Sequence, residues 1–283
     1  MVELPTPTFL TVDEIDIATY RLDPTHPDDA AHAGDVVLCH GTPWSAATWL
    51  PVAQHLAQTR RVFLWDMPGY GASISPSTPA VDLIAQRRRL AALIEHWDLD
   101  RPHVVAHDIG GAVALGAHLL EGQEFASLYL LDIVTLDPWG SPFFRLVADH
   151  EQVFGALPPA LHAALVREYI AGAIRADLDP AWLDDLTRPW TGVDGQAAFY
   201  RQIAQLTSEH TRPIVERLGS VRCPVRIGWG EQDPWIPVGQ ATELAEHLPA
   251  PPVVTTFPGV GHLVPIEATD ALTRDLERWL RNL

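Results

Sequence analysis

Short apolar runs alternate with amphipathic stretches along most of the chain. The apolar runs predict strands at residues 8–12, 15–22, 35–39, 61–65, 103–106, 127–131, 225–229 and 253–257. Apolar residues at helical spacing predict helices at residues 46–58, 81–97, 111–120, 240–247 and 271–280. A strand followed by a helix, repeated along the chain, predicts an α/β fold with a mostly parallel eight-stranded sheet and helices on both faces. The first two strands are almost continuous in sequence, so we expect them to form an antiparallel edge.

One interval breaks this rhythm. Residues 135–214 are rich in proline and tryptophan, with helical patterns at 160–171, 181–186 and 195–206 and no convincing strand. An insertion at the carboxyl ends of parallel strands lies over the place where such sheets bind ligands. We therefore expect a core formed by residues 1–134 and 215–283, with a helical cap, or lid, at 135–214 inserted after the sixth strand.

Composition limits the cellular context and the partners. With 283 residues, 47% of them hydrophobic, the chain can bury one sizeable core. Its formal charge of −17 argues against a nucleic-acid partner or an anionic membrane surface. No stretch approaches the roughly 18 to 20 apolar residues of a membrane span, so a cytoplasmic protein is the expectation. We expect it to be a monomer or a homodimer. Cys39 and Cys223 adjoin apolar runs and are predicted to be free thiols.

The most informative motif is AHDIGG at residues 106–111. Asp108 follows a predicted strand and precedes a predicted helix, which is the context of a nucleophile elbow, and the glycines beside it permit a tight backbone. A carboxylate is a weak nucleophile whose natural electrophiles are strained or activated saturated carbons, such as epoxides and alkyl halides. Attack on an ester carbonyl would form an anhydride, so a plain esterase is disfavoured.

Candidate partners for Asp108 follow other predicted strands. His262, in GVGH, lies in a loop after the last strand and can reach back over the sheet. Asp233, in GEQD, follows strand 225–229 and can accept the other ring proton of His262, fixing its tautomer. The HGTP turn at residues 40–43 can aim the backbone N–H of Thr42, with that of Ile109, at a developing oxyanion.

The motifs HGTP, DMPGYG, AHDIGG, GEQD and GVGH, in this order, resemble the α/β-hydrolase superfamily. Aspartate at the elbow resembles the branch that contains epoxide hydrolases, haloalkane dehalogenases and fluoroacetate dehalogenases. The resemblance implies that Asp108 opens a carbon–oxygen or carbon–halogen bond to form a covalent ester, which water activated by His262 then hydrolyses. Asp132, after the sixth strand, occupies the place where some dehalogenases of this branch carry their acid. Asp233 is favoured and Asp132 is the alternative.

The resemblance also bears on the electrophile. Epoxide hydrolases hold the leaving alkoxide with two lid tyrosines, and Tyr200, in FYR, resembles the surroundings of one of them. Tyr169 is a weaker match. Because both lie in the predicted lid, we expect an apolar epoxide as substrate, bound by these two tyrosines.

Haloalkane dehalogenation is the alternative. That family commonly carries a tryptophan just after the nucleophile and a second donor near the HGxP turn, where this chain has Ile109 and Thr42. A tryptophan from elsewhere in the chain can substitute: Trp44, Trp139, Trp182, Trp190 or Trp235. Fluoroacetate dehalogenases are similar in the sixth-strand aspartate and in His150, but they need arginines soon after the nucleophile, and residues 109–115 contain none.

Two functions of another class stay open: a ligand receptor on this fold and a non-hydrolytic biosynthetic enzyme. The thirteen histidines show no convincing pairing with cysteines or carboxylates at metal-ligand spacing, so no metal and no cofactor are expected. The expected partners are a small apolar electrophile and water.

Overall fold

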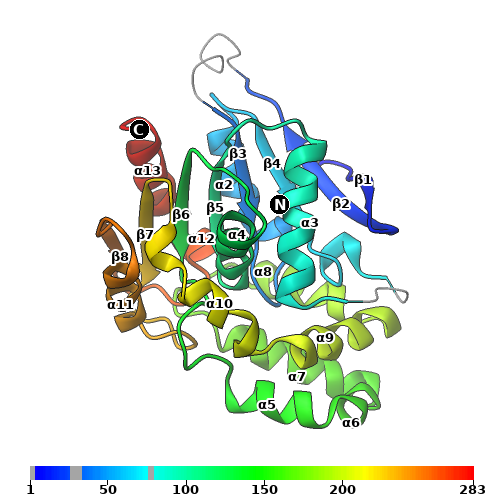
Figure 1. The fold of residues 1–283 in the computed structure, drawn as a ribbon. Helices are drawn as coiled ribbons and strands as arrows, with labels where there is room; N and C mark the ends of the chain where they lie inside the picture. The colour runs from blue at the N-terminus through cyan, green and yellow to red at the C-terminus, as the bar shows by residue number, and fades with distance from the viewer. Residues whose placement is uncertain (1–3, 26–33, 76–79) are drawn as a thin grey trace.

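The computed structural model describes residues 4–25, 34–75 and 80–283. Its centre is an eight-stranded sheet with the strand order β1-β2-β4-β3-β5-β6-β7-β8 (Figure 1). The strands are β1 (Thr8–Val12), β2 (Ile15–Leu22), β3 (Val36–Cys39), β4 (Val62–Trp65), β5 (His103–His107), β6 (Ser127–Leu131), β7 (Val225–Gly230) and β8 (Val254–Phe257). β1 pairs antiparallel with β2, and β2 with β4, while the remaining pairs are parallel. The predicted sheet and its antiparallel edge are confirmed.

Helices cover both faces of the sheet, as predicted. α2 (Leu50–Leu56), α12 (Val264–Glu267) and α13 (Thr269–Leu280) belong to one face, and α3 (Leu83–His96), α4 (Ile109–Leu120) and α11 (Gly239–His247) to the other. Alternate residues of β3 point to opposite faces: Val36 joins the cluster packed on α2 and α13, whereas Val37 joins the cluster packed on α3 and α4. The predicted helix 46–58 is a 3₁₀ turn, Ala46–Trp49, followed by α2.

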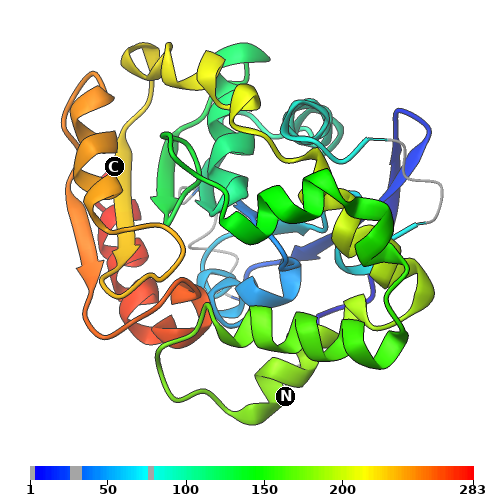
Figure 2. The same ribbon diagram turned by 90° about the horizontal axis from the view of Figure 1, so that it is seen from below.

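A helical insertion separates β6 from β7. It contains α5 (Pro142–Asp149), α6 (Glu151–Gly155), α7 (Pro159–Ala171), α8 (Pro180–Thr187), α9 (Val193–Gln205) and α10 (Arg212–Val215). Residues 132–224 are all described and none of them is in a strand. Figures 1 and 2 show α5 to α9 gathered at one end of the sheet, across the carboxyl ends of its parallel strands. α10 packs against α4.

The helix α5 lies where the sequence pattern predicted no helix. Ser141 caps it by accepting a hydrogen bond from the N–H of Phe144, and Pro142 occupies its first turn. These are ordinary start signals, but the helix is only eight residues long and buries only Val147 fully. Among the described residues, no helix combines the length and apolar character needed to cross a bilayer.

Candidate active site

Asp108 lies at the sharp turn between β5 and α4. Its backbone has φ 53° and ψ −125°, a left-handed φ that residues other than glycine rarely adopt. The turn is crowded on both sides. A Cβ at Gly110 would lie 2.5 Å from the carbonyl oxygen of His40, and one at Gly41 would lie 2.4 Å from Cβ of Asp108. Both positions therefore require glycine, and the tight turn presents the carboxylate at the carboxyl end of β5.

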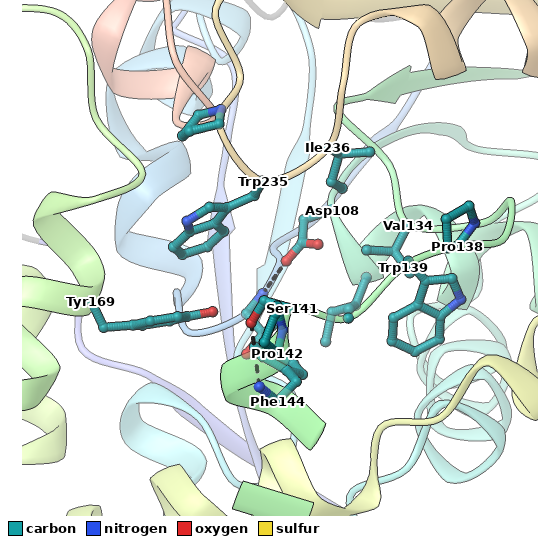
Figure 3. A pocket seen from close by; sticks show the side chains of 14 residues that line it. Asp108, Val134, Pro138, Trp139, Ser141, Pro142, Phe144, Tyr169, Trp235 and Ile236 are labelled. Carbon is teal, nitrogen blue, oxygen red and sulfur yellow. Dashed lines mark hydrogen bonds between the residues drawn. The ribbon is translucent and has the colours of Figure 1, made fainter. Parts of the chain in front are cut away.

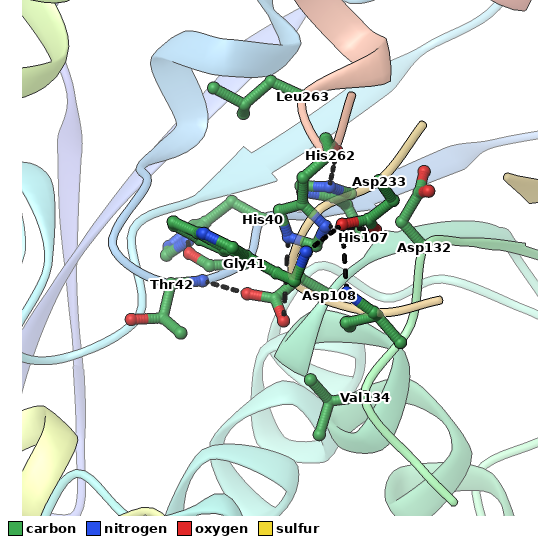
Figure 4. Close-up of polar contacts among 12 residues, drawn as sticks. His40, Gly41, Thr42, His107, Asp108, Asp132, Val134, Asp233, His262 and Leu263 are labelled. Atoms are coloured by element: carbon green, nitrogen blue, oxygen red, sulfur yellow. Dashed lines mark hydrogen bonds and ion pairs between the residues drawn. The ribbon is translucent and has the colours of Figure 1, made fainter. Parts of the chain in front are cut away.

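Two backbone N–H groups hold the Asp108 carboxylate. The N–H of Thr42 donates to Oδ2 at 2.6 Å (Figure 4). The N–H of Ile109, the next residue, also favours the charged form of this carboxylate and lowers its pKa. These are the two groups that the motifs predict as oxyanion donors. An oxyanion formed at Cγ of Asp108 would meet the same donors, which are already oriented.

The His262 ring lies between two carboxylates. Its Nδ1 is 2.7 Å from Oδ2 of Asp233, and its Nε2 is 4.0 Å from Oδ1 of Asp108 with no hydrogen-bond partner in the described part of the chain. Oδ1 of Asp233 accepts the backbone N–H groups of Trp235 and Ile236 at 2.7 and 3.0 Å. Asp233 is therefore rigidly held, with one oxygen directed at the imidazole.

Burial and charge set the protonation of this pair. Burial raises the pKa of Asp108 from 3.8 to about 6, while His262 and the two N–H donors oppose that rise. Burial also disfavours a charged His262, but the carboxylate of Asp233, its hydrogen bond and the carboxylate of Asp108 together raise the pKa of His262 above 6.5. At neutral pH Asp108 is ionised and faces an imidazole that readily takes a proton.

Asp132, the alternative acid, is fully buried beside this group but forms no hydrogen bond with the imidazole nitrogens. Its Oδ1 accepts the N–H of Gly230 at 2.7 Å. In this geometry Asp233 holds Nδ1 of His262. Asp132, Asp233 and His262 are also the one group of metal-ligand type found in the described ranges, with ligand atoms within 4.8 Å of one another. Hydrogen bonds already engage Nδ1 of His262, both oxygens of Asp233 and Oδ1 of Asp132.

An apolar cavity of about 270 Å³ opens over Asp108 (Figure 3). Its lining residues come from the loops after the strands and from the helical insertion: Thr42, Asp108, Ile109, Val134, Pro138, Trp139, Gly140, Ser141, Pro142, Phe144, Tyr169, Pro234, Trp235 and Ile236. Asp108 is the one carboxylate in this lining, which contains no arginine or histidine. The cavity thus suits a small neutral molecule.

Tyr169 of α7 brings a phenol into the cavity. Its ring stacks on Trp235 with centroids 4.8 Å apart, and its hydroxyl points toward the middle of the pocket (Figure 3). No hydrogen bond joins that hydroxyl to another described residue. Burial, and then the charge of Asp108, raise the pKa of Tyr169 well above 10. Tyr169 is therefore a neutral hydrogen-bond donor in the field of the carboxylate.

The other predicted lid residues lie differently. Tyr200 of α9 is absent from the cavity lining, and its hydroxyl bonds Nδ1 of His162 at 2.9 Å among packed aromatic rings. Trp44 stacks behind Trp235 at 5.7 Å without lining the cavity. His150, at the junction of α5 and α6, is exposed and away from it.

Trp139 does line the cavity. Its indole N–H already donates to Oγ1 of Thr211 at 3.0 Å, however. Of the five predicted substrate contacts, the structure thus brings Tyr169 and Trp139 to the cavity over Asp108.

Gln202 of α9 is a buried residue that the sequence did not single out. Its Oε1 accepts the hydroxyls of Thr42 at 2.8 Å and Tyr70 at 2.9 Å, so it joins the helical insertion to the turn that holds Asp108. Its Nε2 has no partner in the described part of the chain. A glutamine within an amphipathic helix carries no motif, so only the fold reveals this link.

The model of the alpha/beta hydrolase family matches residues 36–275, most of the chain. The chain belongs to this family. It is similar to an alpha/beta hydrolase fold protein from Burkholderia ambifaria, with 38% identity, a TM-score of 0.89, and coverage of 96% of this chain and 97% of that one. A haloalkane dehalogenase from Bradyrhizobium elkani shares the fold at a TM-score of 0.79 and 17% identity, with 98% of each chain covered.

Curated relatives of this hydrolase are more distant. A 2-hydroxy-6-oxo-6-phenylhexa-2,4-dienoate hydrolase from Burkholderia cepacia is 21% identical, over 99% of this chain and 98% of its own length. The dihydrolipoyllysine-residue acetyltransferase component of the acetoin cleaving system from Pseudomonas putida is 27% identical over 87% of this chain, which spans 63% of that protein. These relatives share the family and differ from one another in reaction.

Proposed function

We propose that this hydrolase opens an epoxide of a small apolar substrate through a covalent ester on Asp108. The observation that carries the proposal is the hydroxyl of Tyr169, which projects into an apolar cavity beside an ionised, buried carboxylate. Epoxide opening needs a nucleophile on carbon and a hydrogen-bond donor for the departing oxygen. Asp108 and Tyr169 supply this pair.

In the first step, Oδ1 of Asp108 attacks an epoxide carbon and the carbon–oxygen bond breaks. The departing oxygen takes the proton of the Tyr169 hydroxyl, which leaves a hydroxyalkyl ester on Asp108 and a phenolate on Tyr169. Oδ2 stays on the N–H of Thr42 throughout, because that oxygen is already hydrogen-bonded at 2.6 Å.

In the second step, Nε2 of His262 takes a proton from water, and the hydroxide adds to Cγ of the ester. The N–H groups of Thr42 and Ile109 hold the resulting oxyanion. Collapse of this intermediate releases the diol, which takes the proton from His262, and leaves Asp108 as a carboxylic acid. Asp108 then loses this proton to solvent and is again a carboxylate. A proton from solvent returns to Tyr169. Asp233 keeps Nδ1 of His262 paired while the imidazole is charged.

Carbon–halogen hydrolysis uses the same nucleophile and base but needs N–H donors around a halide. The indole N–H of Trp139 is already donated to Thr211, and Trp44 does not line the cavity, so Trp235 is the one tryptophan among the lining residues with an indole N–H left for a halide. A phenol beside the nucleophile can give its proton to the alkoxide formed from an epoxide, whereas a halide ion needs no proton. This comparison favours an epoxide over a haloalkane.

The test is to trap the ester. His262→Gln, which lacks the base, is incubated with styrene oxide and, separately, with a 1-haloalkane, and the intact mass is measured. The proposal expects an adduct equal to the whole epoxide, located on the peptide that carries Asp108. The Asp108→Ala/His262→Gln double variant is the control and should form none.

Three results bear on the proposal. An adduct with the mass of an alkyl group without its halogen would mean that the substrate is a haloalkane and not an epoxide. Absence of any adduct across a panel of epoxides and haloalkanes would contradict the covalent mechanism. In the wild-type enzyme, a single turnover in ¹⁸O-water should leave the heavy oxygen in Asp108 rather than in the first diol released.

A further inference from the structure

Asp132 lies beside the acid of the candidate triad. It follows β6 directly with a left-handed φ of 46°, and its side chain is fully buried. Asp233 follows the neighbouring parallel strand β7, so the two carboxyl groups meet at the same end of the sheet (Figure 4). Their oxygens and the nitrogens of His262 include atoms within 4.8 Å of one another. Two buried carboxyl groups therefore share one small volume.

Asp233 is well supplied with hydrogen-bond donors. Its Oδ2 accepts the Nδ1 hydrogen of His262 at 2.7 Å. Its Oδ1 accepts the backbone N–H groups of Trp235 at 2.7 Å and Ile236 at 3.0 Å. Hydrogen bonds to a carboxylate favour its charged form, so of the two carboxyl groups Asp233 has the surroundings that better stabilise a negative charge.

Asp132 has fewer hydrogen-bond donors than Asp233. Its Oδ1 accepts one backbone N–H, from Gly230 at 2.7 Å, and its Oδ2 is buried without any donor in the described part of the chain. An ionised oxygen there would be desolvated, unpaired and close to the charge of Asp233. A protonated oxygen instead has a neighbouring acceptor, because atoms of the Asp132 and Asp233 carboxyl groups lie within 4.8 Å of one another. A side-chain hydrogen bond with Asp233 is among the causes that raise the pKa of Asp132.

The surrounding charges act in the same direction. Burial first, then the charge of Asp233, raise the pKa of Asp132 well above 3.8, and the N–H of Gly230 opposes them. Glu267 of α12 also raises it, and Glu267 is itself held by several backbone N–H groups. His262, in the loop between β8 and α12, also has a ring nitrogen within 4.8 Å of the Asp132 carboxyl.

We propose that Asp132 is a neutral carboxylic acid that donates its hydrogen to Asp233 and thereby positions and moderates the acid that holds His262. The donation weakens Asp233 as an acceptor, so His262 is a weaker base than it would be beside an undisturbed carboxylate. That matters because His262 must be neutral to take a proton from water. The catalytic part of this role rests on the proposed function.

A second consequence concerns loss of Asp233. Asp132 is kept neutral largely by burial and by the neighbouring charge. Without that charge Asp132 becomes easier to ionise, and it would then place a carboxylate within 4.8 Å of the His262 ring. Asp132 is thus also a reserve acid.

The first experiment reads protonation and needs no substrate. At pH 8, where Asp108 is ionised, infrared spectroscopy of the free enzyme should show the carbonyl stretch of a protonated carboxyl that disappears in Asp132→Asn. Absence of such a band in the wild type, or its persistence in the variant, would overturn the proposal. The pKa of His262 is followed in parallel by NMR, with His262→Gln to assign its signal.

Asp132→Asn and Asp132→Leu form a matched pair. Asparagine keeps an acceptor for Gly230 and a donor for Asp233, so the pKa of His262 should stay within about 0.3 of wild type. Leucine removes the donor, so that pKa should rise by about one pH unit. A fall of similar size in Asp132→Asn would mean that Asp132 is ionised in the wild type and would overturn the proposal. If Asp132→Leu does not fold, the asparagine variant decides alone.

A double-mutant cycle tests the reserve acid with an epoxide that the wild type turns over. The loss of kcat caused by Asp132→Asn should be about tenfold larger or more in an Asp233→Asn background than in the wild type. Equal losses in both backgrounds would overturn the reserve role. If no epoxide or haloalkane is turned over, the proposed function fails, while the infrared and NMR results still decide the state of Asp132.

Discussion

Nε2 of His262 lies 4.0 Å from Oδ1 of Asp108, too far for a hydrogen bond. Oδ2 of the same carboxylate is held by the N–H of Thr42, so Oδ1 is the oxygen left to attack. While Asp108 is ionised, its charge raises the pKa of His262. Esterification of Asp108 removes that charge and makes neutral His262 more populated, as the second step requires. In the proposed reaction, loss of the Asp108 charge in the first step therefore prepares His262 to act as the base in the second step.

Replacing Asp108 by alanine tests the nucleophile. Asp108→Ala should lower the turnover of any epoxide substrate by about 10⁴-fold or more, because no other carboxylate lines the cavity. Circular dichroism and thermal unfolding serve as controls that the fold is intact. Activity retained in a folded Asp108→Ala protein would contradict the covalent scheme.

The raised pKa of Asp108 also predicts how stability depends on pH. Its pKa is about 6 in the folded protein and 3.8 as the ordinary value, so the folded state binds more protons between these pH values. Stability contributed by this group therefore falls as pH rises from about 4 to 6, by about 3 kcal/mol in total. Asp108→Asn should remove that loss. The difference in urea unfolding free energy between variant and wild type should be near zero at pH 4 and largest above pH 7.

The core of the fold was predictable from local patterns, because buried parallel strands appear as continuous apolar runs and their helices as periodic ones. The helical insertion was less predictable from such patterns. α7, α8 and α9 matched predicted segments, but α5 was missed because its eight residues bury a single side chain fully and contact the cavity instead. Short helices take their stability from packing, which a local pattern does not contain.

Part of the candidate site was likewise predictable from local motifs, and part depended on packing. Asp108, Asp233 and His262 follow strands that end at one edge of the sheet, so their motifs already implied that they meet. Their catalytic roles stay predictions. Which tyrosine reaches the cavity depends on how α7 and α9 rotate against the core, and Tyr200 carried the stronger motif while Tyr169 lines the cavity. Packing between helices decides that choice.

The two lid tyrosines make a matched pair of variants. Tyr169→Phe keeps the ring stacked on Trp235 and removes the hydroxyl, so the rate of ester formation from an epoxide should fall by about 10²-fold or more. Tyr200→Phe removes a hydroxyl that bonds His162 and should change this rate much less. Stopped-flow or single-turnover kinetics measure the step. Equal effects of the two substitutions would remove Tyr169 from the proposed role.

The lining of the cavity predicts discrimination by charge. Because Asp108 is ionised and the lining contains no arginine or histidine, a carboxylate on the substrate would be repelled and unpaired. We expect kcat/KM for styrene oxide to exceed that for its 4-carboxylate by about 100-fold or more. The comparison is made at pH 8, with both epoxides below KM. A preference for the anion would contradict the assignment of this cavity as the substrate site.

Gln202 predicts a stabilising link between the helical insertion and the core. Gln202→Leu would leave the buried hydroxyls of Thr42 and Tyr70 without their acceptor, which should cost about 2–4 kcal/mol of unfolding free energy. Gln202→Glu keeps an acceptor but adds a negative charge near Asp108, so it should move the acid limb of the kcat/KM profile to higher pH as the pKa of Asp108 rises. Urea unfolding and pH–rate profiles separate the two effects. If Gln202→Leu has the same unfolding free energy as the wild type, the hydroxyls of Thr42 and Tyr70 must find other acceptors. Gln202 would then not be the residue that stabilises the Thr42 turn.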